Sequence, residues 1–409
     1  MKENLRRTAG SLLVVGLGGT ELTNLERGWL KLVRPGGIIL FRRNIADARQ
    51  ARALLGEATG LCATNSFRCV DVEGGTVDRL RDALAPMPSA QAVAQAALRS
   101  GWDRWSPTLS VAAATTREDG APSSSPRSQR RDLGHPTEHP MGLACEHGEL
   151  VARGVKAFGF NTTLAPVLDL ALPASAEVLG TRAAAATATG VVEYARPFLA
   201  GLAGHGVVGC GKHFPGLGGG ALDSHLETPA IRRSSGDLWR EDLAPYRELR
   251  GELPMVMVSH AAYPDTPGKD RPASVSPYWI AAVLRKRIGY REIVLSDDLE
   301  MGGILKFMPI EEAAVAAIRA GMDLLEICHS PELILRAFEA LIAEGERSAA
   351  FSKLLMGRAE QVTRQRAKLF AGGVPKALSS RQFEALRARI LRFSEAVEKA
   401  QPTAEAQPA

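Results

Sequence analysis

The chain contains few aromatic residues and no long apolar run. Phe, Trp and Tyr together make up 5% of its 409 residues. No segment approaches the roughly 18 apolar residues that a membrane-spanning helix needs, so we expect no membrane span. Residues 11–16 are apolar and follow Lys2, Arg6 and Arg7, but no polar region with a small-residue cleavage site comes after them. This stretch favours a first strand over a signal peptide.

Paired cysteines and a strong net charge are also missing. The five cysteines, at positions 62, 69, 145, 210 and 328, have no paired spacing. They predict reduced, buried thiols in a reducing compartment, and we expect a cytoplasmic protein. The formal net charge of +5 is modest, and the arginines are scattered along presumed helices, which argues against a nucleic-acid partner. We further expect a monomer.

Motifs for metals and phosphates are weak. His213 and His225 belong to no His-x-x-x-His pattern or Cys/His cluster, so the sequence predicts no metal centre. The glycine-rich stretch 216–220 lacks Gly-Lys-Ser/Thr, which argues against a phosphate cradle. Residues 16–19 lack the full Gly-x-Gly-x-x-Gly spacing of a dinucleotide site, and a turn at a strand end explains them equally well.

The remaining pattern is an alternation of short apolar strands and helices. An apolar content of 45% with 23% charged residues is typical of a soluble globular protein. Continuous apolar runs predict strands that are buried on both faces, at 12–16, 37–41, 69–72, 163–167, 207–212, 255–259, 293–296 and 324–328. Helical periodicity predicts helices at 21–34, 46–59, 147–157, 184–204, 237–250, 277–287, 310–320 and 331–344. The sequence therefore predicts an α/β fold, a TIM-type (β/α)8 barrel, with an open doubly wound sheet as the alternative.

Two segments fall outside the alternation. Residues 102–142 are rich in Pro, Ser and Arg and lack periodicity, which indicates a poorly ordered insertion. A frame error in the translated sequence is the alternative explanation. We expect a catalytic domain at 1–345, a C-terminal helical extension at 346–399 and a disordered tail at 400–409.

Charged and polar residues gather where the predicted strands end. In a parallel barrel, this is the end at which active sites form. The residues in question are Asp71, Glu73, Arg79, Asp169, Arg182, Lys212, His213, His260, Asp297 and Asp298. Individually, Asp298 also fits a helix N-cap, and Glu73 also fits a hydrogen bond to the Gly-Gly turn that follows it. A set of residues converging from five successive strands favours a functional site.

The residue types favour retaining cleavage of a glycosidic bond. Such cleavage needs a carboxylate that attacks the anomeric carbon and a second group that first donates and then accepts a proton. Asp297, at a rigid strand end, fits the nucleophile, and we expect Lys212, Arg182 and Arg79 to keep it ionised. His225 fits the proton donor because the pKa of an imidazole lies near neutrality, and Asp223 is close enough in sequence to orient the ring.

Several motifs resemble glycoside hydrolase family 3 and, within it, the single-domain bacterial β-N-acetylhexosaminidases. The matching stretches are 36–44, 70–75, 159–161, 165–169, 212–216, 223–225 and 296–301. They occur in the order found in the family and cover about residues 10–345 apart from the insertion. The Asp-Ser-His sequence at 223–225 is typical of the hexosaminidase branch, because β-glucosidases of the family usually take the acid/base from a second domain.

The resemblance implies a barrel enzyme without a cofactor that removes β-linked N-acetylglucosamine from muropeptide fragments during peptidoglycan recycling. It implies Asp297 as nucleophile and His225 as acid/base, assisted by Asp223. The implied sugar ligands are Asp71, Arg79, Arg182, Lys212 and His213. The chain departs from the family at Leu217, where a histidine is frequent, and at Thr76, where an arginine is common. Action on β-glucosides, transfer to phosphate and an inactive sugar-binding role therefore remain alternatives.

Overall fold

Eight parallel strands form the centre of the structure, a computed structural model that describes residues 2–100, 142–220, 228–269 and 271–401. The strands are β1 (Leu13–Gly16), β2 (Gly37–Leu40), β3 (Phe67–Val70), β6 (Thr162–Thr163), β7 (Gly211–Phe214), β8 (Met255–Val258), β9 (Ile293–Asp298) and β10 (Leu324–Ile327). The predicted insertion at 102–142 and the predicted tail at 400–409 lie almost entirely outside the described residues.

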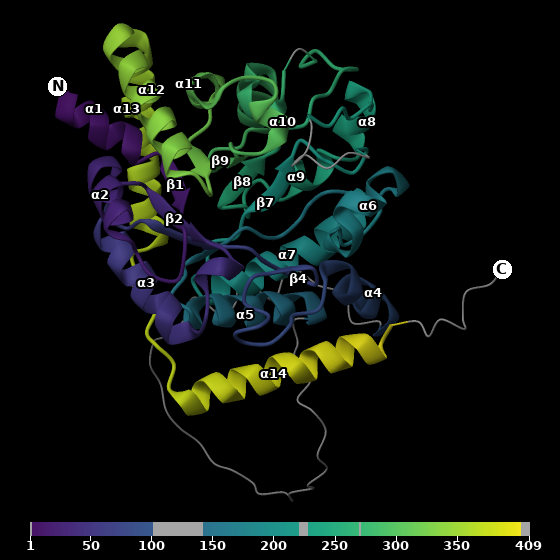
Figure 1. Ribbon diagram of the computed structural model, residues 1–409. Coiled ribbons are helices and arrows are strands. Elements are labelled where there is room, and N and C mark those ends of the chain that lie inside the picture. Colours follow the sequence, from purple (N-terminus) through teal and green to yellow (C-terminus); the bar gives the residue numbers. More distant parts are fainter. Residues whose placement is uncertain (1, 101–141, 221–227, 270, 402–409) are drawn as a thin grey trace, which may run out of the picture.

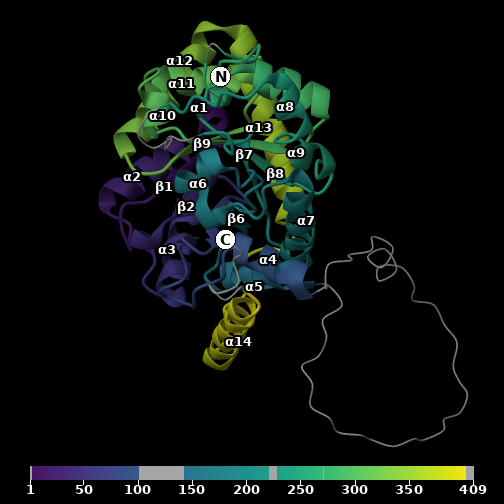
Figure 2. The same cartoon turned by 90° about the vertical axis from the view of Figure 1, so that its right-hand side faces the viewer.

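The strands follow one another around a closed barrel. Their order is β6-β3-β2-β1-β10-β9-β8-β7, so consecutive barrel strands pair with each other except β6 and β7, and β1 pairs with β10. Two isolated parallel bridges, Thr162–Val208 and Val167–Lys212, join the segments at the two ends of this row. The strands lie at the centre of the molecule with helices around them (Figures 1 and 2). The fold is a TIM-type (β/α)8 barrel, and the alternative of an open doubly wound sheet is wrong.

Helices connect successive strands and cover the outside of the barrel. The longer ones are α2 (Asn24–Val33), α3 (Ala48–Gly60), α5 (Gly142–Ala157), α7 (Ala188–Gly204), η6 (Tyr278–Ile288), α11 (Ile310–Ala320) and α12 (Pro331–Arg347). The shorter ones are α6 (Ala176–Leu179), α8 (Ser235–Arg240), α9 (Ala244–Glu248), α10 (Gly302–Leu305), η1 (Arg42–Asn44), η3 (Pro173–Ser175), η4 (Gly180–Arg182) and η5 (Ala273–Val275). The single helix predicted at 237–250 is in fact two. Pro245, in the first turn of α9, has no N–H group with which to continue α8.

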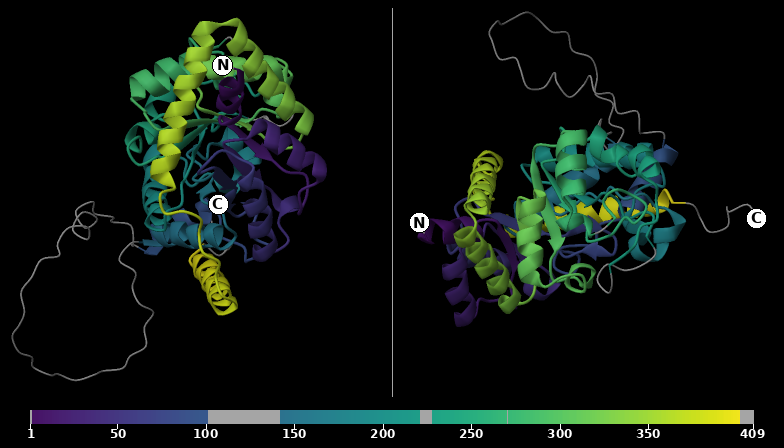
Figure 3. Two further views of the ribbon diagram at one scale, coloured as in Figure 1. Left: turned by 90° about the vertical axis from the view of Figure 1, so that its left-hand side faces the viewer. Right: turned by 90° about the horizontal axis from the view of Figure 1, so that it is seen from above.

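Four of the longer described helices lie outside the predicted β–α units, and the last two of them fall in the span 346–399 that was predicted as a helical extension. These are α1 (Lys2–Gly10), α4 (Ala90–Ser100), α13 (Ala349–Leu369) and α14 (Ser380–Lys399). α13 crosses the end of the barrel at which the strands begin (Figure 3, left), where Arg366 donates to the carbonyl oxygen of Gly36 at 3.2 Å. α14 packs against α4 and α5 (Figure 1). No helix in the described part of the chain is both long and apolar enough to cross a membrane.

Candidate active site

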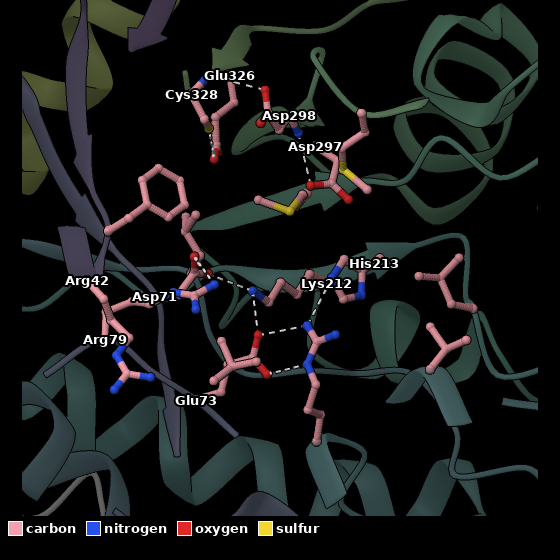
Figure 4. A pocket seen from close by; sticks show the side chains of 18 of the residues that line it. Arg42, Asp71, Glu73, Arg79, Lys212, His213, Asp297, Asp298, Glu326 and Cys328 are labelled. Carbon is pink, nitrogen blue, oxygen red and sulfur yellow. Dashed lines mark hydrogen bonds and ion pairs between the residues drawn. The ribbon is translucent and has the colours of Figure 1, made fainter. Parts of the chain in front are cut away.

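A cavity of about 660 Å3 opens at the end of the barrel where the strands terminate (Figure 4). This volume lies within the range of small-molecule sites. Its charged and imidazole side chains are Arg42, Arg43, Asp71, Glu73, Arg79, Glu177, Arg182, Lys212, His213, Asp297, Asp298, Glu326 and His329. Six of the eight predicted site residues are among them. The other two, Asp223 and His225, lie outside the described residues.

A buried ion-pair network around Lys212 forms one wall of the cavity. The Lys212 Nζ atom lies 2.9 Å from Asp71 Oδ1 and 2.6 Å from Glu73 Oε1. Arg182 donates to both oxygens of Glu73, from Nε at 2.8 Å and from Nη2 at 2.9 Å. Glu73 therefore links two cations from distant segments, Lys212 in β7 and Arg182 in η4 (Figure 4). The alternative that Glu73 only hydrogen-bonds its Gly-Gly turn is wrong.

All three partners in this network carry their charge at neutral pH. Burial alone would raise the pKa of Glu73, but the Arg182 guanidinium and the Lys212 ammonium outweigh it and hold that pKa well below its usual range. Burial alone would lower the pKa of Lys212, but the Asp71 and Glu73 carboxylates outweigh it and raise that pKa. The pKa of Arg182 is raised in the same way, mainly by Glu73.

The turn after Glu73 depends on glycine. Gly74 has a φ of +89°, which L side chains rarely adopt, and a Cβ atom there would lie 2.0 Å from the carbonyl oxygen of Pro88. The turn joins β4 (Val72–Gly74) to β5 (Val77–Asp78) in a small antiparallel pair. This pair holds the Glu73 side chain at the cavity.

Asp169 fixes the orientation of His213. The carboxylate of Asp169 is fully buried and accepts the backbone N–H of His213 at 3.2 Å and that of Leu217 at 2.7 Å. Its Oδ2 atom also lies 2.6 Å from Nδ1 of the imidazole. The opposite ring nitrogen, Nε2, lies 3.5 Å from Arg182 Nη2. The imidazole is thus held between a carboxylate and a guanidinium at the cavity wall.

Asp297 lies near the end of β9 and is kept as a carboxylate. Its Oδ1 atom accepts the backbone N–H of Asp298 at 2.9 Å. Burial alone would raise the pKa of Asp297, but the His213 and His260 imidazoles, this backbone N–H and the Lys212 ammonium outweigh it, so the pKa is lowered. An ionised carboxylate at a rigid strand end has the properties of a nucleophile.

The cations that lower the pKa of Asp297 differ in part from those predicted. Lys212 contributes, as expected. Arg182 instead pairs with Glu73, and Arg79 lies 3.9 Å from Asp71. Two imidazoles, His213 and His260, neither of which was predicted for this role, make larger contributions.

The side chain of the neighbouring Asp298 accepts hydrogen bonds from backbone N–H groups and does not cap a helix. Its Oδ1 atom accepts the N–H groups of Glu300 at 3.1 Å and Cys328 at 3.2 Å. The N-cap of α10 is Met301, so the predicted N-cap role of Asp298 is wrong. Burial, helped by the nearby Glu300 and Asp297 carboxylates, raises the pKa of Asp298 to about 7. Its ionisation near neutrality contrasts with the lowered pKa of Asp297.

Comparisons with known proteins identify the family. The model of the glycosyl hydrolase family 3 N-terminal domain matches residues 127–364. A β-hexosaminidase of Alkalilimnicola ehrlichii is 36% identical over 323 residues, which cover 79% of this chain and 82% of that protein. The chain belongs to glycoside hydrolase family 3.

Solved structures of family 3 members share the fold. A β-N-acetylglucosaminidase from Paenibacillus sp. has a TM-score of 0.77 and 28% identity, and the match covers 95% of this chain and 68% of that one. NagZ from Neisseria gonorrhoeae has a TM-score of 0.69 and 27% identity, with coverage of 94% and 97%. NagZ has also been solved in complex with N-trifluoroacetyl-D-glucosamine, with a TM-score of 0.67. As a family 3 member with β-hexosaminidases among its relatives, this chain is a glycoside hydrolase.

Sequence reasoning missed some cavity residues. Glu326 received no role, although its charge inside the apolar run 324–328 was a visible signal. Asp169 was noted at a strand end, but its pairing with His213 depends on tertiary structure. Phe41 also lines the cavity, and the Arg79 guanidinium lies over its ring, 5.8 Å from the ring centroid.

One group of described residues offers the ligand types of a metal site. Ligand atoms of Asp298, Glu300 and His329 lie within 4.8 Å of one another. However, Asp298 Oδ1 already accepts two backbone N–H groups, and Glu300 Oε1 accepts that of Ser330 at 2.6 Å. Backbone hydrogen bonds therefore explain the positions of both carboxylates.

Proposed function

We propose that this chain is a retaining β-N-acetylhexosaminidase that releases terminal β-linked N-acetylglucosamine. The observation that carries the proposal is the Asp297 carboxylate, whose pKa is lowered, in a polar cavity of small-molecule size. Relatives about one third identical over most of the chain are named β-hexosaminidases. The complex of NagZ with a glucosamine derivative supports the sugar class.

In the first step, a carboxylate oxygen of Asp297 attacks the anomeric carbon. The glycosidic C–O bond breaks, and the leaving oxygen takes a proton from His225. In the second step, neutral His225 accepts a proton from water, the water oxygen bonds to the anomeric carbon, and Asp297 is released. Two inversions give net retention of configuration. The roles of His225 and of Asp223, which orients its ring, rest on the sequence.

The ion-pair network acts as a preformed sugar-binding wall. Asp71, Arg79, Arg182, Lys212 and His213 present carboxylate, guanidinium, ammonium and imidazole groups to the same cavity as Asp297. Because the charges are already paired with one another, their positions are fixed before the sugar binds. Preorganised polar groups of this kind bind hydroxyls with little reorganisation.

The resemblance to the family supports a muropeptide fragment as the natural substrate, hydrolysed in the cytoplasm during peptidoglycan recycling. We infer that the enzyme works as a monomer and needs no cofactor, because the proposed mechanism uses only side chains of the chain. The partner is then a carbohydrate, with neither nucleic acid nor membrane involved.

Hydrolysis of aryl β-glycosides tests the function. We expect release of the aryl group from the N-acetylglucosaminide, little release from the glucoside, and no acceleration by phosphate. Asp297→Ala should remove nearly all activity, and the exposed Asp265→Ala serves as its control. His225→Ala should lose most activity with poor leaving groups, which need the proton most. The control His205→Ala, at the C-cap of the outer helix α7, should show no such dependence. A preference for the glucoside, or phosphate-dependent turnover, would assign the chain to one of the alternatives.

A further inference from the structure

Glu326 places a carboxyl group inside the barrel, on the wall of the cavity. It lies in β10, whose other members are Leu324, Leu325 and Ile327. Side chains alternate along a strand, so Glu326 shares its face with Cys328, and both line the cavity. Figure 4 shows the two side chains near Asp298. Glu326 is 4% exposed, so this carboxyl group is removed from bulk water.

Only one of the two Glu326 oxygens has a hydrogen-bond partner among the described residues. The Cys328 thiol donates to Oε1 at 3.2 Å. Oε2 is buried and has no partner. The backbone is held separately, since the Glu326 N–H donates to Ser296 Oγ at 3.0 Å. Buried polar atoms are nearly always hydrogen-bonded, so an unpaired oxygen at a cavity wall needs an explanation.

We propose that Glu326 is a further sugar-binding residue, whose Oε2 forms a hydrogen bond to a hydroxyl group of the sugar held in this cavity. The proposal rests on the proposed function, because it assumes that the cavity binds a sugar. A bound hydroxyl would give Oε2 the partner that the protein does not supply, while Cys328 holds the other oxygen. The role is positional and does not require Glu326 to take part in bond cleavage.

The surroundings of Glu326 favour the protonated form of its carboxyl group. Burial raises its pKa well above the usual range, and the carboxyl groups of Asp71, Asp298 and Asp297 add to this. Three thiols in the described part of the chain, Cys69, Cys210 and Cys328, also couple to it, and burial raises their own pKa values. The facing residue on β1 is Val14, which carries no charge. A neutral acid donates its proton to a hydroxyl oxygen, which an ionised carboxylate cannot do.

Calorimetric binding of N-acetylglucosamine and its 3-, 4- and 6-deoxy analogues tests the proposal without requiring turnover. The proteins are the wild type, Glu326→Gln, Glu326→Leu and the control Glu248→Gln on the exposed surface of α9. Glu326→Gln keeps a donor and should bind the parent sugar within about threefold of the wild type. Glu326→Leu should bind it about tenfold more weakly, the worth of one hydrogen bond.

The deoxy analogues separate a sugar contact from a merely structural role. The wild type should bind one analogue about tenfold more weakly than the parent sugar. Glu326→Leu should bind that analogue and the parent sugar almost equally, because the variant already lacks the partner of the missing hydroxyl group. The proposal would be overturned if every analogue lost the same affinity in the wild type and in Glu326→Leu. It would also be overturned if Glu326→Leu bound the parent sugar as well as the wild type does, or if the wild type bound no sugar. A wild type that binds the sugar but hydrolyses no glycoside would instead overturn the proposed function.

A measurement that involves no sugar tests the charge state. Because the pKa of Glu326 is raised in the folded protein, the folded state holds a proton that the unfolded state releases above the ordinary glutamic acid pKa. The stability of the wild type should therefore fall relative to Glu326→Gln as pH rises above that value. A difference in urea midpoint that does not change with pH would contradict a neutral Glu326.

Discussion

Replacement of Glu73 by glutamine should destabilise the fold far more than the loss of an ordinary ion pair. Glu73 is 3% exposed and is the shared partner of Lys212 and Arg182. The substitution keeps the shape of the side chain but removes its charge. Arg182 then loses its bidentate partner, while Lys212 keeps Asp71.

The expected loss follows from the burial of the partners. Removal of one member of a buried ion pair leaves an uncompensated charge and costs about 3–5 kcal/mol. The glutamine oxygen still accepts one hydrogen bond, so we expect the lower end of that range. The double variant Glu73→Gln with Arg182→Met should recover part of the loss, because the stranded guanidinium is gone. For a domain whose total stability is about 5–15 kcal/mol, either effect is easily measured.

Urea unfolding followed by tryptophan fluorescence gives the free energy of unfolding. The control is Glu57→Gln, in an exposed pair with Arg27 at 2.6 Å, which should cost about 0–1 kcal/mol. Because the pKa of Glu73 is lowered in the folded state, its contribution is present above the ordinary glutamic acid pKa and is lost as pH falls below it. Wild type and Glu73→Gln should therefore converge in acid. A loss no larger than that of the control, or one independent of pH, would refute the reasoning.

Three further predictions follow from the same geometry. In Gly74→Ala, the new Cβ atom would clash with Pro88 at a residue whose φ is +89°, so the melting temperature of the protein should drop by several degrees. An unchanged melting curve would contradict the turn geometry. Asp169→Asn should raise KM about tenfold with a smaller effect on kcat, because His213 loses its charged partner. Steady-state kinetics measure both constants, and an effect confined to kcat would contradict this prediction. The five cysteines are buried, and burial raises the pKa of Cys62 to about 12, so iodoacetamide should modify them only in urea. Rapid modification of the native protein, read by mass spectrometry, would contradict that burial.

Much of the barrel was predictable because its strands are apolar on both faces. All eight predicted strands are present, and β1, β2, β8 and β10 match to within one residue. The strand predicted at 207–212 is displaced, since β7 runs from Gly211 to Phe214 and includes Lys212 and His213. Charged residues in a buried strand are stable here only because carboxylates from distant segments pair with them. Local sequence carries no such information.

Helices that lack bulky apolar residues escaped prediction for a related reason. α4 is rich in alanine and glutamine, and α1 is mostly polar. Both helices are held by packing against neighbouring helices. In contrast, the long amphipathic α12 begins at Pro331, as predicted. Hydrophobic periodicity finds helices with a strong apolar face and misses those held by tertiary contacts.

The site was predictable in position but only partly in its connections. Strand ends correctly placed Asp71, Lys212 and Asp297 in one cavity. Glu73 pairs with both Lys212 and Arg182 only because three segments of the chain meet in the fold. The contacts that hold the His213 ring depend on the fold in the same way. Motifs at strand ends predicted which residues share the cavity, whereas the ion pairs between them depend on the folded chain.

Covalent trapping tests the central claim, that Asp297 is the nucleophile, most directly. The protein is incubated with a fluorinated N-acetylglucosaminyl donor, which slows release of the glycosyl-enzyme, and is then digested and sequenced by mass spectrometry. The account predicts a single adduct on the carboxylate of Asp297, absent from Asp297→Ala and unchanged in Asp265→Ala. An adduct on Asp298, or active turnover of unmodified donors with no adduct at all, would contradict it.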